Sequence, residues 1–236
     1  MIPSDFSLIW KLRMDENIYF EYDDKEIAYL KSRDWILGAA IEEIGHISRP
    51  VNPDIFTALI NSIVGQQIST KAHATIWARI QNLLPVVNPE TIANSGDEDL
   101  QACGMSFRKV GYIKEIAASV CNGSLDLEYL RTLSDDEVCV RLSKLKGIGV
   151  WTAEMLMTFS MQRPNIISYG DLAILRGMRM LYRHRKITPE LFAKYRRRYS
   201  PYATVASLYL WAVAGGACPS LTDPAAKQAS SRKEKI

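Results

Sequence analysis

Apolar residues recur along this chain at the three- and four-residue spacing of amphipathic helices, whereas the alternation typical of strands is scarce. After Ser69, for example, Ile76, Ile80 and Leu83 fall on one helix face. Helices are predicted over residues 53–64, 70–84, 97–102, 106–122, 134–145, 150–161, 171–182, 188–199 and 202–214, with one more over 25–44. The pattern therefore predicts an all-α protein.

Composition narrows the class of protein. The 236 residues are 47% hydrophobic and 23% charged, which suits a buried core in one or two domains and excludes disorder as the main state. The longest apolar stretch, 205–218, is shorter than the roughly 20 residues of a membrane span, and the first ten residues lack the basic start of a secretion signal. We expect a cytoplasmic, nucleoid-associated protein without membrane contact, with a flexible polar tail over 220–236.

The four cysteines, Cys103, Cys121, Cys139 and Cys218, form no CxxC pair. This spacing argues against a zinc knuckle or a compact iron–sulfur ligand set and favours reduced, structural thiols. Positive charge is concentrated elsewhere: the net charge is +3, yet residues 176–198 hold nine Lys or Arg and one acid. Such a segment is typical of a surface that binds a polyanion, and also of a solvated helix face.

The most informative segment is LKGIGVWTAE, residues 145–154. Gly147 and Gly149 flank Ile148 between two predicted helices, so the backbone can turn sharply and leave amide N–H groups free at the start of the second helix. Free amides at the positive end of a helix suit a phosphate, while Ile148 fills the space between the helices. An ordinary helix–helix turn is the alternative.

Five motifs in order resemble one family. They are IVGQQIS at 63–69, GMSFRKVGYI at 104–113, the LKGIGVWTAE segment, GDLAILRG at 170–177 and SPYATVASLYLW at 200–211. Together they resemble the helix-hairpin-helix (HhH-GPD) DNA glycosylase superfamily, most nearly its alkylpurine, 3-methyladenine type branch. The resemblance spans roughly residues 52–215.

The resemblance implies a two-layer helical fold. A six-helix barrel over 53–164 would carry the hairpin, and a second helical domain, from 1–52 and 165–219, would carry the catalytic aspartate. Backbone carbonyls of Ser143, Leu145 and Ile148 would hold a structural Na⁺ or K⁺ ion against DNA. No cofactor is expected for catalysis, and the missing four-cysteine cluster excludes the iron–sulfur branch.

The resemblance also implies site residues. Asp171 would stabilise the positively charged sugar, although an aspartate at a helix start is usually an N-cap. The base pocket and the side chains that fill the gap in the DNA would come from aromatic and loop positions. Trp211 suits the core as well as the pocket, and Met105 suits the core better, because methionine usually fills gaps in a core. These positions are Trp151, Tyr169 and Trp211 for the pocket, and Gln67 and Met105 for intercalation.

The remaining contacts would go to the DNA backbone. They are expected from Gly147, Ile148, Gly149, Lys146, Thr152, Arg176 and Arg179. Strand-nicking relatives carry a lysine where this chain has Trp151, so a monofunctional enzyme is expected. The predicted function is release of alkylated purines from damaged double-stranded DNA by a monomer. The alternatives are a glycosylase for a neutral lesion such as 8-oxoguanine, hypoxanthine or uracil, and a non-catalytic DNA-binding protein.

Overall fold

The computed structural model describes residues 18–225, and every regular element in that range is a helix. Tyr19 and Pro50 form an isolated antiparallel β-bridge outside the helices. The helices are α2 (Asp24–Arg33), α3 (Trp35–Ile44), α4 (Ile55–Gly65), α5 (Thr70–Leu83), α6 (Pro89–Asn94), α7 (Asp97–Ala102), α8 (Phe107–Cys121), α9 (Leu127–Leu130), α10 (Asp135–Leu142), α11 (Val150–Phe159), α12 (Leu172–Tyr182), α13 (Pro189–Tyr199) and α14 (Ala203–Ala214). The predicted helical class is confirmed.

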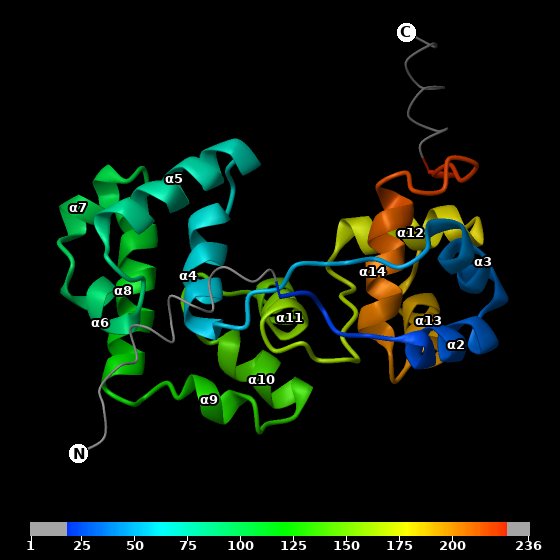
Figure 1. Cartoon of the computed structure of the whole chain (residues 1–236), viewed down its shortest axis with the longest axis horizontal. Coiled ribbons are helices and arrows are strands. Elements are labelled where there is room, and N and C mark those ends of the chain that lie inside the picture. The colour runs from blue at the N-terminus through cyan, green and yellow to red at the C-terminus, as the bar shows by residue number, and fades with distance from the viewer. Residues whose placement is uncertain (1–17, 226–236) are drawn as a thin grey trace, which may run out of the picture.

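Two groups of helices lie side by side, each around its own apolar core (Figure 1). The first group contains α4 to α11 and buries side chains such as Ile60 and Ile113 completely. It holds eight helices where six were expected, because the sequence pattern missed the short α6 and α9. The second group combines α2 and α3 with α12, α13 and α14.

The second core depends on a close contact between α12 and α14. A Cβ atom added to Gly177 of α12 would lie 2.2 Å from the carbonyl oxygen of Leu210 in α14. Only glycine therefore fits at this crossing. The contact fixes α12, and with it the residue that precedes α12 in the chain, Asp171.

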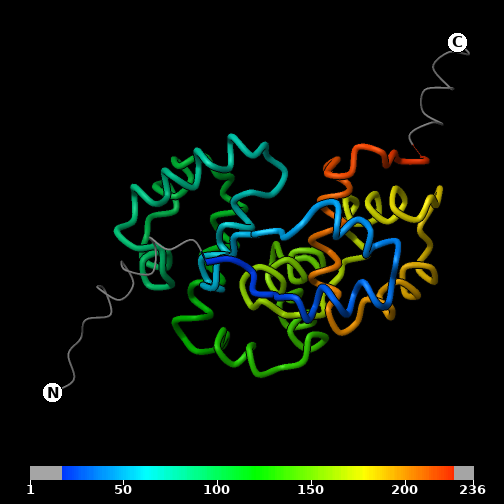
Figure 2. The backbone as a smooth tube through the Cα atoms, turned by 45° about the vertical axis from the view of Figure 1, so that its right-hand side comes forward, coloured from blue at the N-terminus to red at the C-terminus, as the bar shows by residue number. Residues whose placement is uncertain are grey.

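The N-terminal helices α2 and α3 pack against the C-terminal helices α12, α13 and α14 (Figure 2). The single helix predicted over 25–44 is wrong, because Asp34 separates α2 from α3 and caps α3 through the N–H groups of Ile36 and Leu37. Asp34 is 2% exposed, and its other oxygen accepts hydrogen bonds from Tyr182 Oη at 2.9 Å and Arg198 Nη1 at 2.6 Å. A buried carboxylate thus links the N-terminal helices to α12 and α13.

The last described residues also pack on the second group. Asp223, within the range expected to be a flexible tail, accepts two hydrogen bonds from the Arg179 guanidinium at 2.9 and 2.5 Å. Residues 226–236 lie outside the described part of the chain, as do residues 1–17. Within 18–225, no helix is both long and apolar enough to cross a bilayer.

Candidate active site

The turn between α10 and α11 has the tight form that its glycines predict. Gly147 has a φ of +84°, and a Cβ added there would lie 2.7 Å from Cδ2 of Tyr112 in α8. Both the backbone conformation and the packing therefore require glycine. Ile148 is 4% exposed and fills the space beneath the turn, as predicted.

The start of α11 offers free amides. No side chain caps this helix at Gly149, and the first amide with a backbone partner is that of Ala153, which donates to the Gly149 carbonyl at 3.0 Å. Within residues 18–225, nothing accepts a hydrogen bond from the N–H groups of residues 150–152. Three amides at the positive end of a ten-residue helix form a site for an anion such as phosphate.

Asp171 has two separate sets of partners. Its Oδ1 accepts hydrogen bonds from the N–H groups of Ala173 and Ile174, at 2.9 and 3.0 Å, and so caps α12. Its Oδ2 accepts a hydrogen bond from Trp151 Nε1 at 2.9 Å. The capping role expected of an aspartate at this position is real, but it uses one oxygen only. The second oxygen faces the hairpin helix.

The Asp171 carboxylate lies just beneath the surface. The residue is 7% exposed, whereas Trp151, which contacts it, is 49% exposed and Tyr169 is 40% exposed. Gly170, between Tyr169 and Asp171, is exposed as well. The Oδ2 oxygen of Asp171 is thus hydrogen-bonded to a side chain at the surface, not to one in the protein core.

The three aromatic residues predicted for the base pocket differ in their contacts and in their distance along the chain from Asp171. Trp151 contacts Asp171 directly, and Tyr169 lies two residues before it with its ring edge-on to Phe192 at a centroid distance of 5.1 Å. Trp211 is half-buried and packs against Phe159, with ring centroids 5.5 Å apart. The structure brings Trp151 to the carboxylate, while the contacts of Trp211 belong to the second core.

A second carboxyl group near Asp171 escaped the sequence analysis. Glu154 is half-buried on α11, one helical turn after Trp151. Its burial raises the pKa of its carboxyl group, and the neighbouring Asp171 charge raises it further. The spacing of three residues from Trp151, which places both side chains on one helix face, was the available signal.

The two candidates for intercalation differ in exposure. Gln67 is exposed in the turn between α4 and α5, with a φ of +58° that is unusual for a residue other than glycine. Met105 is 4% exposed and belongs to the first core, so its assignment to DNA does not fit its position. Phe107, two residues later at the start of α8, is an apolar residue that is 58% exposed, and the sequence analysis did not single it out.

Several residues that were predicted to contact the DNA backbone are bound to other groups or buried. The guanidinium of Arg179 is bound by Asp223 through two hydrogen bonds, so it is not free to grip DNA, whereas the Arg176 side chain is 54% exposed. Thr152 is 8% exposed, which leaves only its amide N–H for a ligand. Lys146 forms an exposed ion pair with Glu115 at 2.9 Å, a contact that is weak enough to exchange for a phosphate.

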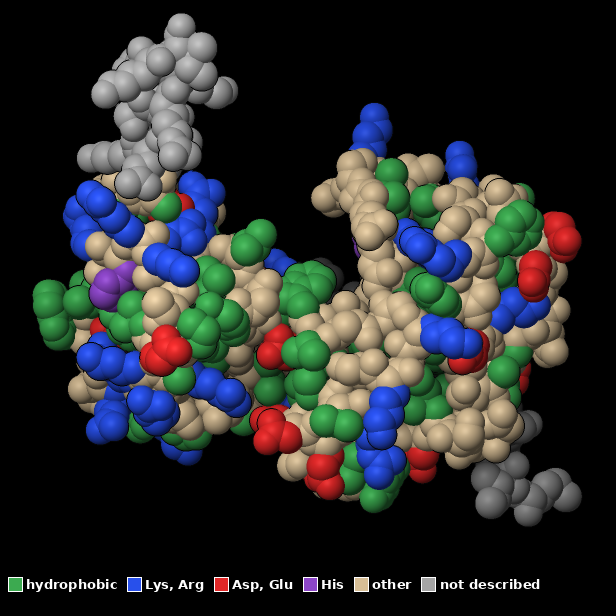
Figure 3. Space-filling model, turned by 180° about the vertical axis from the view of Figure 1, so that it is seen from behind, with side chains coloured by type: hydrophobic (Ala, Val, Ile, Leu, Met, Phe, Trp, Pro, Cys, Tyr) green, Lys and Arg blue, Asp and Glu red, His purple; other side chains and the backbone are tan. Residues whose placement is uncertain are grey.

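The basic segment covers one side of the second group. Seen from behind, Lys and Arg side chains gather there, and the surface is hollowed between the two groups (Figure 3). The exposed cations of this segment are Arg176, Arg183, Arg185, Lys186, Lys194, Arg196 and Arg197. Such a distribution favours approach of a polyanion to this half of the molecule.

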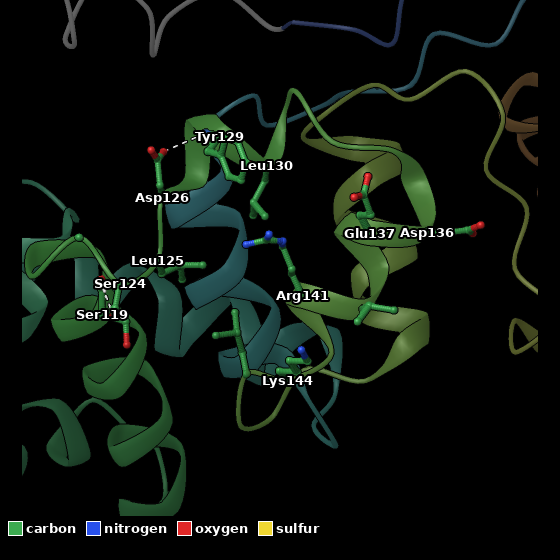
Figure 4. Close-up of a pocket in the computed structure, with 13 residues that line it drawn as sticks. Ser119, Ser124, Leu125, Asp126, Tyr129, Leu130, Asp136, Glu137, Arg141 and Lys144 are labelled. Carbon is green, nitrogen blue, oxygen red and sulfur yellow. Dashed lines mark hydrogen bonds between the residues drawn. The ribbon is translucent and has the colours of Figure 1, made fainter.

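A pocket of about 780 Å³ lies elsewhere, between the end of α8, α9 and α10 (Figure 4). Arg141 lies in it, over the ring of Tyr129 at 5.4 Å from the centroid. Its wall carries three acidic residues, Asp126, Asp136 and Glu137, which repel phosphates, and neither Trp151 nor Asp171 lines it. The candidate site is therefore the Trp151–Asp171 pair and the adjoining hairpin.

Comparison with known proteins identifies the family of this chain. Residues 60–201 match the family described as HhH-GPD superfamily base excision DNA repair protein. The chain belongs to the HhH-GPD superfamily. It is 36% identical over 161 residues to DNA-3-methyladenine glycosylase 1 of Schizosaccharomyces pombe, covering 66% of this chain and 71% of the relative.

Solved structures of other proteins have a similar fold. A DNA-3-methyladenine glycosidase from Bacillus halodurans superposes with a TM-score of 0.78 at 36% identity, over 86% of this chain and 95% of that one. The 3-methyladenine DNA glycosylase of S. pombe, in complex with abasic DNA, gives a TM-score of 0.69 at 31% identity, over 80% and 95%. The hairpin and Asp171 both lie within the matched residues 60–201.

Proposed function

We propose that this HhH-GPD protein is a DNA glycosylase of base excision repair that extrudes alkylated purines, such as 3-methyladenine, from double-stranded DNA and hydrolyses their glycosidic bond. The observation that carries the proposal is the hydrogen bond from Trp151, on the helix after the hairpin, to Oδ2 of Asp171, the carboxylate oxygen that does not cap α12. It places a carboxylate beside the point where the DNA strand would be anchored. The relatives named DNA-3-methyladenine glycosylase support the choice of substrate.

The chemistry follows from the placement of the groups. As the glycosidic bond breaks, positive charge develops on the deoxyribose, and a fixed carboxylate stabilises that charge. Two backbone amides hold Oδ1 of Asp171, so the carboxylate needs little reorganisation during the reaction. Trp151 is 49% exposed, and the face of its ring can attract the cationic ring of an alkylated purine with about 0.5 to 2 kcal/mol.

The reaction would end at an abasic site. Strand cleavage in this superfamily needs an amine that attacks the sugar, and the position that would supply it is Trp151 in this chain. Lys146 lies in the hairpin and pairs with Glu115, where it suits a phosphate contact better than nucleophilic attack. We infer a monofunctional enzyme that acts as a monomer and needs no cofactor for catalysis.

The hairpin carbonyls are suited to a monovalent cation. Among the described residues, none donates a hydrogen bond to the carbonyl oxygens of Ser143 or Ile148, whereas that of Leu145 accepts the Ile148 N–H at 3.0 Å. Oxygen atoms without donors fit a hard cation such as Na⁺ or K⁺. When bound, the ion would neutralise charge between these carbonyls and the DNA phosphate.

Duplexes that contain a single alkylated adenine, hypoxanthine, uracil or 8-oxoguanine test the proposal, with alkali used to reveal abasic sites. We expect release of the alkylated base alone, without strand cleavage before alkali. Asp171→Asn should lower the single-turnover rate about a hundredfold or more, while asparagine keeps the cap of α12 and hence the fold. Release of a neutral base alone, or equal rates for both proteins, would refute the assignment.

A further inference from the structure

The turn between α4 and α5, residues 66–69, is held by a lysine from a distant helix. The ammonium group of Lys109, on α8, donates hydrogen bonds to the carbonyl oxygens of Val64 at 2.8 Å and Gln66 at 2.7 Å. Both carbonyls belong to the end of α4, where the helix leaves its last carbonyls without intrahelical partners. Lys109 therefore fixes the point at which the chain leaves α4.

This contact is not a surface ion pair. Lys109 is half-buried, and among the described residues no carboxylate lies within ion-pair distance of its ammonium group. Burial lowers its pKa, and the neighbouring Arg108 charge lowers it further. The two carbonyls and the negative end of α4 are thus what stabilises the charge at this position.

A second contact ties the same turn to the hairpin. The Gln66 side chain donates from Nε2 to the Gly147 carbonyl at 2.6 Å. The next residue, Gln67, takes a left-handed backbone conformation with a φ of +58° and presents an exposed side chain. Such a conformation is unfavourable for a residue other than glycine and persists where neighbours hold it.

We propose that Lys109 is a positioning residue for base extrusion, which together with Gln66 holds the 66–69 turn so that Gln67 enters the DNA at a fixed place relative to the phosphate-binding hairpin. The inference rests on the proposed glycosylase function. Lys109 touches neither the lesion nor the reacting bond in this arrangement. Its loss should therefore impair opening of the base pair and leave the chemistry at Asp171 intact.

The test compares Lys109→Met with Lys114→Met. Lys114 lies on the same helix and also donates to a carbonyl, that of Ser95 at 2.8 Å. Its contacts are with the segment between α6 and α7, however, and not with the 66–69 turn. Each protein is given an alkylated adenine in a fully paired duplex and in a single-stranded oligonucleotide, where no base pair must open. Single-turnover rates and the fluorescence of a 2-aminopurine next to the lesion are measured.

For Lys109→Met we expect the rate on the paired duplex to fall about tenfold or more, the loss typical of a hydrogen bond made by a charged group, with the rate on single-stranded DNA nearly unchanged. The 2-aminopurine signal of base extrusion should fall with it. Lys109→Arg keeps the charge and the donors and should recover part of the paired-duplex rate. Lys114→Met should match the unsubstituted protein on both substrates.

Equal losses on both substrates, or no loss on the paired duplex, would overturn the proposal. If Lys109→Met unfolds at the assay temperature, Lys109→Gln, which removes the charge and keeps a polar side chain, is used for the same comparison, and a ratio of paired to single-stranded rates equal to that of the unsubstituted protein would overturn it. Failure of the proposed function itself is distinct, because then the unsubstituted protein would release no alkylated base from either substrate.

Discussion

The indole N–H of Trp151 points at the carboxylate of Asp171, 2.9 Å from Oδ2, across twenty residues of sequence. The donor sits in the first turn of the helix that follows the hairpin, and the acceptor caps the start of α12. A single hydrogen bond therefore links the two groups of helices at the candidate site. Because the acceptor is charged, the bond is stronger than one between neutral groups.

Trp151→Phe removes this donor and keeps an aromatic face. We expect the single-turnover rate on an alkylated duplex to fall about tenfold or more, as for other hydrogen bonds to charged groups, with little change in the affinity for abasic DNA. Trp35→Phe, at a position that is 79% exposed on α3, is the matched control and should have the normal rate. An unchanged rate for Trp151→Phe would show that the hydrogen bond does not assist the reaction.

Glu154→Gln tests the electrostatics of the site through stability. Burial raises the pKa of Glu154 above its ordinary value of 4.5, so folding favours the protonated form. The contribution of Glu154 to the free energy of unfolding is thus fully present below the unfolded-state pKa and is lost as the pH rises through the folded-state pKa.

Glutamine resembles the protonated acid at every pH. Glu154→Gln should therefore be more stable than the unsubstituted protein near neutral pH, and the difference should vanish at about pH 4. Urea unfolding at both pH values measures it. A variant that is less stable at neutral pH would mean that the charged carboxylate has a stabilising partner. The candidates are the Ser168 hydroxyl and the Arg196 guanidinium, which both lower the pKa of Glu154.

Gly177→Ala should destabilise the second group of helices. The added methyl group would lie 2.2 Å from the Leu210 carbonyl oxygen, so α12 and α14 must separate, at a cost of about 1 to 3 kcal/mol or more. Gly111→Ala is the control, because nothing lies within 4 Å of a Cβ at that position of α8. There alanine should stabilise the protein by about 0.5 to 1 kcal/mol. Chemical denaturation distinguishes the two, and equal effects would contradict the close contact.

The cysteines should differ sharply in reactivity. Burial raises the pKa of Cys218 to about 11, so at pH 8 only about one molecule in a thousand carries the thiolate. Cys121 is exposed. A disulfide reagent should label one thiol rapidly in the native protein and all four after unfolding, and Cys121→Ser should abolish the rapid phase. Rapid labelling of Cys218 would contradict its burial.

Local signals predicted the helix starts well. The Ser134 side chain and Glu137 form a capping box at the start of α10, where a helix over 134–145 is predicted, and Ser69 and Thr188 cap α5 and α13. These hydrogen bonds join residues three apart, so the sequence contains all their determinants. The hairpin was predictable for the same reason, since Gly147 and Ile148 act within one turn.

The wrong predictions concern residues whose contacts come from distant parts of the sequence. Asp34 interrupts the predicted 25–44 helix because it binds Tyr182 and Arg198, more than 140 residues later. Arg179 was assigned to DNA because its partner, Asp223, lies in a segment whose composition predicted a flexible tail. The periodicity of an isolated segment contains no information about such partners.

The order in which the helices leave the ribosome differs from the order in which they find partners. The core of α4 to α11 is complete once Ile166 has been made, and those helices can then pack. Helices α2 and α3 emerge earlier, but the residues that cover Leu30 and Leu37 arrive only with α12 to α14. During synthesis the apolar faces of α2 and α3 therefore stay uncovered until α12 to α14 have been made.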